Sequence, residues 1–267
     1  MRPPALACDC HIHVFGPYAR YPLAAARKYT PPEAALEDYR RVMRTLGTGR
    51  VVLVQPSVYG TDNSCQRDAI AALGDRARGV AVIDETASGR ELGGLAAAGF
   101  VGVRLNIMRA ENFDSLEGLA RRAADHGWHV QLHVPGWSLP EIAPRLLALP
   151  ADIVIDHLGR VDPHAGLEQP AFQALLRLVD SGRCWVKLSA PYRMDPEGAP
   201  YRHAAPFARE LVRRNPGRMV WGTDWPHPDV AVMPEDRGLL DVLRDWAPDE
   251  AVRNRILVDN PAKLYKF

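Results

Sequence analysis

Four polar residues at strand-like positions give the first indication of chemistry. His11 and His13 occupy alternate positions of an apolar run, so the two-residue period of a strand turns both imidazoles to one face. His157 follows another apolar run, and Asp224 ends the last one. Imidazoles and a carboxylate that meet at one point can bind a metal ion, move a proton or stabilise a developing negative charge. The sequence therefore predicts a catalytic site.

Eight short apolar runs, which alternate with amphipathic segments, must position these residues. That pattern is typical of parallel strands buried on both faces. Several runs follow a glycine, as expected where a helix ends and a strand begins. The pattern predicts one α/β domain over 1–267, a (β/α)8 TIM barrel with a C-terminal helical tail at 249–267. The predicted strands are 7–15, 50–55, 79–83, 102–105, 129–134, 152–156, 185–189 and 219–223.

The C-terminal ends of barrel strands form one face, so polar residues there should surround one pocket. An open doubly wound sheet is disfavoured because no glycine-rich phosphate loop follows the first strand. We expect Asp156 to support the barrel rim, and His227 either to line the rim or to fill a turn. The polar strand ends are His11, His13, Gln55, Ser57, Arg104, Asn106, His133, Asp156, His157, Lys187, Ser189 and Asp224.

The segment CDCHIH at 8–13 contains four potential zinc ligands. Regular alternation turns Cys8, Cys10 and Ile12 towards the surrounding helices, away from the two histidines. We therefore expect no Cys/His zinc site, and four cysteines in a chain of this length do not indicate a disulfide framework.

The composition indicates a folded globular protein: 267 residues, 47% hydrophobic and 24% charged. A formal net charge of +1 provides no surplus of cations for nucleic acid or a membrane surface, so we expect neither partner. The first residues lack the apolar core of a secretion signal, and no apolar stretch is long enough for a membrane span. These features predict a cytoplasmic protein, whose oligomeric state stays open.

Seven segments together resemble a known family: CDCHIHVFGP, QPSVYGTDNS, GVRLN, IDHLGR, KLSAPYR, GTDWPHP and NPAKLY. They are similar to the branch of the amidohydrolase superfamily that contains 2-pyrone-4,6-dicarboxylate lactonases and related sugar-lactone hydrolases. The resemblance implies a carboxylic-ester hydrolase that opens an anionic lactone. Its best substrate would be 2-pyrone-4,6-dicarboxylate, giving 4-oxalomesaconate or 4-carboxy-2-hydroxymuconate in aromatic-acid degradation.

The resemblance also implies a set of substrate contacts. Several are arginines, which suits a substrate with two planar carboxylates because each can bind a guanidinium in a fork. A neutral sugar lactone would not need them. The expected contacts are Tyr29, Ser57, Arg104, Arg109, Arg160 and Arg193, together with His133, which fits a site with or without a metal.

In the mechanism we predict, Asp224 takes a proton from the attacking water, and His11, His13 and His157 stabilise the oxyanion. The resemblance implies that no metal is required. The fourth strand carries Arg104 where many amidohydrolases have a lysine that bridges two metals, which argues against a binuclear centre. A single divalent ion such as zinc, bound by His11, His13 and Asp224, remains the alternative.

Other functions stay open on sequence alone. The same face could serve a sugar-lactone hydrolase, a lactone isomerase or a metal-dependent decarboxylase. A barrel that only binds a ligand is disfavoured by the intact histidines and Asp224.

Overall fold

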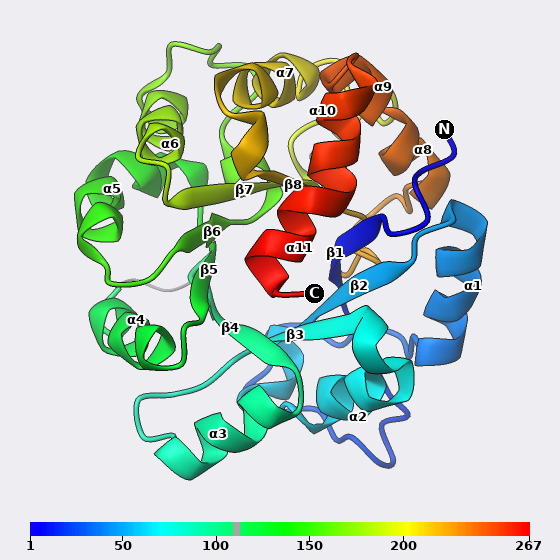
Figure 1. Cartoon of the computed structure of the whole chain (residues 1–267), viewed down its shortest axis with the longest axis vertical. Helices are drawn as coiled ribbons and strands as arrows, with labels where there is room; N and C mark the ends of the chain where they lie inside the picture. The colour runs from blue at the N-terminus through cyan, green and yellow to red at the C-terminus, as the bar shows by residue number, and fades with distance from the viewer. Residues whose placement is uncertain (109–112) are drawn as a thin grey trace.

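Eight parallel strands form a closed ring in the computed structural model, which describes residues 1–108 and 113–267 (Figure 1). Backbone hydrogen bonds close the ring, from Asp224 N to His11 O and from His13 N to Trp225 O, each 2.8 Å. The predicted (β/α)8 barrel is confirmed. Its strands are β1 (Cys8–Ile12), β2 (Arg50–Val54), β3 (Ala77–Ala81), β4 (Phe100–Asn106), β5 (His129–His133), β6 (Ile153–Ile155), β7 (Cys184–Ser189) and β8 (Met219–Gly222).

Helices surround this ring (Figure 1). Long segments join β1, β6, β7 and β8 to the helices that follow them. The helices are α1 (Leu36–Leu46), α2 (Ser64–Leu73), α3 (Gly89–Ala97), α4 (Leu116–Asp125), α5 (Leu139–Ala148), α6 (Pro170–Asp180), α7 (Ala205–Arg214), α8 (Asp236–Asp241), α9 (Leu243–Trp246), α10 (Glu250–Asn254) and α11 (Asn260–Tyr265). Three short helical turns carry site residues: η1 (Ser57–Tyr59), η4 (His157–Arg160) and η5 (Pro191–Arg193).

Local sequence signals begin and end these helices. Ser88 caps α3, because its hydroxyl accepts the backbone N–H of Glu91 while the Glu91 carboxylate accepts the N–H of Ser88. At the end of α1, Gly47 adopts a left-handed backbone with φ of 82°. The chain turns there and enters β2 three residues later, as the glycine pattern predicts.

The C-terminal helix α11 lies across the N-terminal end of the barrel (Figure 1). Arg50 and Arg78, near the beginnings of β2 and β3, hold their guanidinium groups over the ring of Phe267, at 5.1 and 4.8 Å from its centre. Leu264 and Tyr265 cover an apolar layer inside the barrel. That layer consists of Cys8, Cys10, Val52, Val54, Val80, Val101, Val154, Trp185 and Val220.

The position of Cys8 and Cys10 in this inner layer corrects the sequence prediction that both point towards the helices. The pairing of β1 with β2 shifts by one residue between Asp9 and Ile12, because these pair with Val51 and Leu53. This β-bulge turns two successive residues, Cys10 and His11, into the barrel. Ile12 points outward, as predicted.

Asp9 joins the first and last strands from the outer side of the bulge. Its carboxylate accepts hydrogen bonds from the backbone N–H and the hydroxyl of Thr223, at 2.9 and 2.7 Å, and from the hydroxyl of Tyr39 at 3.2 Å. Burial raises the pKa of Asp9 to about 6 despite these donors. The bonds fix β8 beside the histidine segment of β1.

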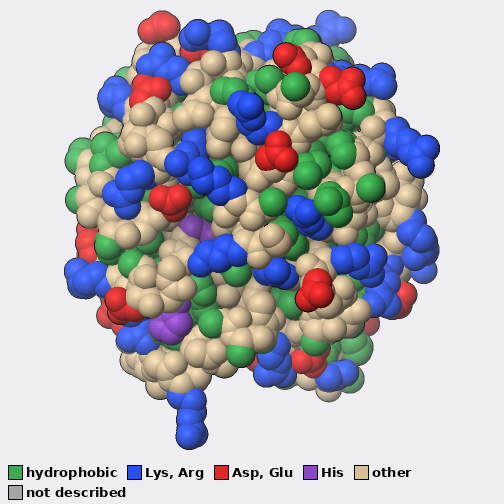
Figure 2. Space-filling model, in the orientation of Figure 1, with side chains coloured by type: hydrophobic (Ala, Val, Ile, Leu, Met, Phe, Trp, Pro, Cys, Tyr) green, Lys and Arg blue, Asp and Glu red, His purple; other side chains and the backbone are tan. Residues whose placement is uncertain are grey.

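The face that carries α11 shows Lys and Arg spread over it and interspersed with Asp and Glu (Figure 2). No continuous basic stripe crosses this view, in keeping with the small net charge. In the described part of the chain, none of the helices has the length and apolar character needed to cross a membrane.

The close approach of β8 to β1 makes Gly222 a test of barrel closure. A Cβ at this position would lie 2.7 Å from the backbone N of His11. We expect Gly222→Ala to lower the free energy of unfolding by about 1–3 kcal/mol, measured by urea denaturation, because β8 must move away from β1. Gly94→Ala in α3 is the control, since nothing lies within 4 Å of its added Cβ. Equal behaviour of the two variants would contradict this account.

Candidate active site

A cavity of about 380 Å³ opens at the C-terminal ends of the strands. It brings together six of the seven predicted substrate contacts, and Arg109 lies outside the described residues. His13, His157 and Asp224 also reach the cavity wall, and His11 lies behind them against Asp224. The lining residues are His13, Lys28, Tyr29, Ser57, Arg104, Asn106, Met108, His133, His157, Arg160, Arg193, Asp224, Pro228 and Asp229.

The two oxygens of the Asp224 carboxylate have different surroundings. Oδ1 faces the Nε2 atoms of His11, His13 and His157, at 3.5, 3.6 and 3.8 Å. Oδ2 accepts hydrogen bonds from the Tyr192 hydroxyl at 2.8 Å and from Nε and Nη2 of Arg193 at 3.1 and 2.9 Å. One oxygen is therefore held by donors, while the other is directed towards the histidines.

Burial alone would raise the pKa of Asp224, but the guanidinium of Arg193 and the neighbouring histidines hold it well below its usual value. Burial lowers the pKa values of His11 to about 3, and also those of His13 and His157. The histidines are therefore neutral at neutral pH, so Arg193 is the cation that keeps Asp224 ionised.

Hydrogen bonds at Nδ1 decide what the Nε2 atoms can do. His13 Nδ1 lies 2.7 Å from the carbonyl oxygen of Val54, which only accepts, so the hydrogen of a neutral His13 is on Nδ1 and its Nε2 is an acceptor. His157 Nδ1 lies 2.9 Å from the hydroxyl of Ser189, which can donate or accept. This hydrogen bond argues against the predicted oxyanion-donor role of His13, because a neutral His13 with its hydrogen on Nδ1 has none on the nitrogen that faces the site.

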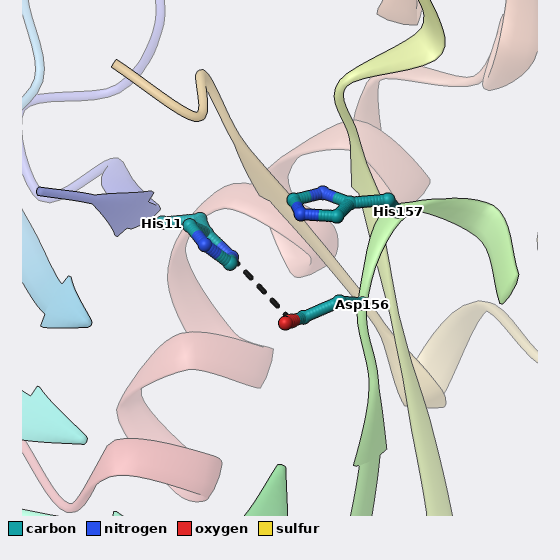
Figure 3. Close-up of side chains that lie close together, drawn as sticks. All are labelled: His11, Asp156 and His157. Atoms are coloured by element: carbon teal, nitrogen blue, oxygen red, sulfur yellow. Dashed lines mark ion pairs between the residues drawn. The ribbon is translucent and has the colours of Figure 1, made fainter. Parts of the chain in front are cut away.

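Asp156 lies inside the barrel, which corrects the expectation that it supports the barrel rim. Figure 3 shows its carboxylate directed at the imidazole of His11, with Oδ1 3.4 Å from Nδ1, while His157 extends from the following residue. Its other oxygen, Oδ2, accepts from Nε and Nη2 of Arg104 at 3.3 and 3.2 Å and from Gln131 at 3.1 Å. Asp156 thus connects the floor of the pocket to an arginine in its wall.

Lys187 completes this buried cluster. Its ammonium donates to the carbonyl of Cys10 at 2.8 Å, approaches His11 Nδ1 at 3.3 Å and lies 3.8 Å from Asp156 Oδ1. Burial lowers the pKa of Lys187 to about 8. Burial also opposes ionisation of the Asp156 carboxyl, but nearby positive charge holds its pKa well below the usual value. Because His11 is neutral, Lys187 and Arg104 provide this positive charge.

The loops that follow β6, β7 and β8 adopt left-handed backbone at residues other than glycine. The φ angles are 54° at His157, 50° at Arg160, 48° at Ala190 and 66° at Asp224. Such conformations each cost on the order of 1 kcal/mol or more and occur where surrounding contacts impose them, commonly at active sites. Asp224 is therefore not the cap of a following helix.

The arginines differ in their partners. Arg104 pairs with Asp156 and Arg193 with Asp224, whereas Arg160 has no carboxylate partner among the described residues. Burial and the charge of Arg193 lower the pKa of Arg160. Arg160 is a partly buried cation that forms no salt bridge in the described part of the chain, and the charge of Asp224 acts on it only from a greater distance.

The two histidines that the sequence left undecided occupy different places. His133 lines the cavity, with Nδ1 3.4 Å from Arg104 Nη2 and its ring 4.9 Å from that of His157. His227 is buried behind the site, where Nδ1 lies 3.1 Å from the Tyr192 hydroxyl and Nε2 lies 2.8 Å from Asp236. His227 therefore supports Tyr192 and does not line the described cavity.

Comparison with known proteins identifies the family. The family model described as amidohydrolase matches residues 8–267. The chain is an amidohydrolase. It is 39% identical to a 2-pyrone-4,6-dicarboxylate hydrolase of Comamonas testosteroni, over 98% of this chain and 90% of the relative. It is 37% identical to a 4-sulfomuconolactone hydrolase of Hydrogenophaga intermedia, over 96% and 88%, and 35% identical to a D-galactarolactone isomerase of Agrobacterium fabrum, over 99% and 92%.

The donor atoms of this amidohydrolase fit one divalent ion. His11, His13 and Asp224 each offer a ligand atom within 4.8 Å of the others, and His11 Nε2 is buried without a hydrogen-bond partner. Two imidazoles and a carboxylate are ligands that suit zinc. A second group, His11, Asp156 and His157, has similar spacing, but Arg104 and Lys187 already neutralise its carboxylate. The residues present therefore suit one ion better than two.

Sequence reasoning missed several residues of this amidohydrolase site. Lys187 was recognised as a polar strand end but given no role, although a lysine in a buried strand is itself unusual. Gln131, which donates to Asp156, alternates with His133 on β5 and could have been found by that period. No signal pointed to Tyr192, because its contact with Asp224 depends on the turn after β7.

We expect substitutions of Asp156 and Lys187, two members of the buried cluster, to change the free energy of unfolding by different amounts. Asp156→Ala leaves Arg104 and Lys187 buried without a carboxylate, so we expect a loss of about 3–5 kcal/mol in the free energy of unfolding. Lys187→Met keeps the Asp156–Arg104 pair and removes one buried cation, so it should change the stability by less than about 1.5 kcal/mol. Urea denaturation of both variants measures the difference, and a larger loss for Lys187→Met would contradict this assignment of charges.

Proposed function

We propose that this amidohydrolase hydrolyses a small anionic lactone, with 2-pyrone-4,6-dicarboxylate as the best candidate. The observation that carries the proposal is Arg160, a partly buried cation that lines the cavity beside Arg193 and forms no salt bridge with a carboxylate among the described residues. A ligand carboxylate would supply the counter-charge and form paired hydrogen bonds with the guanidinium. The pyrone-dicarboxylate and sulfomuconolactone hydrolases, named for anionic substrates, support the same class.

A second anion-binding region lies across the barrel mouth from Arg160. Lys28, Tyr29 and Ser57 line the cavity from the segments that follow β1 and β2, whereas Arg160 follows β6. In a ring of eight strands, β2 and β6 are on opposite sides. A planar ring with a carboxylate at each end would span this distance, and a cavity of about 380 Å³ is of the size that small ligands occupy.

Asp224 acts as the general base in this proposal. Its Oδ1 removes a proton from water while the water oxygen forms a bond to the lactone carbonyl carbon. When the tetrahedral intermediate collapses, the bond from that carbon to the ring oxygen breaks. Asp224 returns the proton to the departing oxygen, so the product is the ring-opened acid and the enzyme is unchanged.

The three histidines divide the remaining tasks. His11 and His157 can present a hydrogen on Nε2 and stabilise the oxyanion, provided that Lys187 and Ser189 donate to their Nδ1 atoms. His13 presents an acceptor, which orients a hydrogen of the attacking water beside Asp224. One divalent ion held by His11, His13 and Asp224 would instead polarise the lactone carbonyl.

Arg193 connects substrate binding to the strength of this base. Its guanidinium donates to Asp224 Oδ2 and to the carbonyl of Pro228, and it also lines the cavity. A substrate carboxylate competes with Asp224 for these donors. Any weakening of the Arg193–Asp224 pair raises the pKa of Asp224 and makes it a better proton acceptor when substrate is bound.

Replacing the base should separate chemistry from folding. We expect Asp224→Asn to keep the fold and to lower turnover by about two or more powers of ten, because the amide cannot accept the proton. The assay follows the loss of ultraviolet absorption of 2-pyrone-4,6-dicarboxylate, and circular dichroism confirms folding. Near-native turnover of Asp224→Asn would remove Asp224 from the base role.

Wild-type enzyme treated exhaustively with chelator should remain active, because the proposed mechanism requires no metal ion.

The partnerless arginine tests the substrate class. Arg160→Met should cost on the order of 2–5 kcal/mol in transition-state binding for the dicarboxylated lactone, because one carboxylate loses its cation, and should have little effect on a neutral lactone. Steady-state kcat/KM on both substrates measures this, with Arg213→Met on the exposed face of α7 as the control. Equal losses on both substrates would reject recognition of an anion by Arg160.

The resemblance to a galactarolactone isomerase favours a second candidate, isomerisation of a lactone on the same face. Product analysis by NMR separates the two, because hydrolysis yields an open chain and isomerisation keeps the ring.

A further inference from the structure

Lys187 lies between the imidazole of His11 and the carboxylate of Asp156, inside the barrel and away from the cavity wall. It is fully buried. Its ammonium approaches His11 Nδ1 at 3.3 Å, and Asp156 Oδ1 approaches the same nitrogen at 3.4 Å. Two groups of opposite hydrogen-bonding character therefore compete for one atom.

The outcome of that competition decides which nitrogen of His11 carries the hydrogen. An ammonium only donates, so contact with Lys187 requires a lone pair on Nδ1 and places the hydrogen on Nε2. A carboxylate only accepts, so a bond to Asp156 would require the hydrogen on Nδ1. The contact with Lys187 has hydrogen-bond geometry, whereas Asp156 Oδ1 has no hydrogen-bond partner among the described residues. The arrangement favours Lys187.

The hydrogen on Nε2 changes what His11 offers to the site. This nitrogen has no hydrogen-bond partner in the described part of the chain and lies 3.5 Å from Asp224 Oδ1. It can donate to a developing oxyanion. It cannot bind a metal ion at the same time, because a metal needs the lone pair that the hydrogen occupies.

In many metal sites, a carboxylate takes the Nδ1 hydrogen of a histidine and so leaves Nε2 free to bind the metal. Asp156 and His11 are placed to form such a pair, but Lys187 donates to His11 Nδ1 and so keeps Asp156 from accepting a hydrogen there. We propose that Lys187 is the positioning residue that fixes His11 as a hydrogen-bond donor and weakens metal binding by His11, His13 and Asp224. The inference rests on the proposed function for the catalytic value of that donor.

Zinc affinity tests the proposal without any substrate. In Lys187→Met, Asp156 should take the Nδ1 hydrogen and leave Nε2 free for the metal. We expect the purified variant to bind zinc about 10–100-fold more tightly than the wild type, measured by competition with a chromophoric chelator. Lys263→Met, at an exposed position of α11, is the control and should behave as the wild type. Unchanged zinc affinity in Lys187→Met would overturn the proposal.

The wild-type protein provides a second test if Lys187→Met does not fold. Nitrogen-15 NMR of the histidine side chains, with His11→Gln used to assign the signals of His11, distinguishes a hydrogen on Nε2 from one on Nδ1. The proposal requires Nε2–H in the wild type. A hydrogen on Nδ1 of His11 would overturn it. Failure to hydrolyse any anionic lactone would reject the proposed function but leave the zinc and NMR results interpretable.

Discussion

The ion cluster around Asp156 is the interaction on which the site depends. A buried carboxylate is costly unless it is paired, and here Arg104 and Lys187 provide the pairing. The two cations contact different parts of the site. Arg104 lines the cavity, while Lys187 lies under His11. The charge that stabilises the barrel interior therefore also positions the groups that would meet the substrate.

Asp224 shows how the fold gives the two oxygens of one carboxylate different surroundings. Tyr192 and Arg193 hold Oδ2, and the left-handed backbone at Asp224 directs Oδ1 towards the three histidines. A carboxylate held by an arginine is a weaker proton acceptor, because the positive charge lowers its pKa. In the mechanism proposed here, the substrate's own carboxylate offsets that effect. Selectivity for anionic ligands and activation of the base would then have one physical origin.

The sequence could predict the order of the elements better than the direction of particular side chains. Apolar runs and glycines located all eight strands. The strand ends gave about half of the residues that line the cavity, while Tyr29, Arg160 and Arg193 came from the family resemblance. Period-two alternation failed at Cys8 and Cys10, because no residue type announces a bulge. Asp156 was placed at the rim because its partners Arg104 and Lys187 come from strands far away in the sequence. Such errors arise where long-range pairing overrides a local rule.

The bulge in β1 has a consequence for how relatives should be aligned. Because one extra residue separates Asp9 from Ile12, the strand delivers both Cys10 and His11 to the interior without changing the register of its neighbours. A single-codon insertion or deletion at this point would exchange one inward side chain and leave the rest of the barrel in place. A gap of one residue just before the histidine pair should therefore be read as a change in active-site chemistry and not as loop variation.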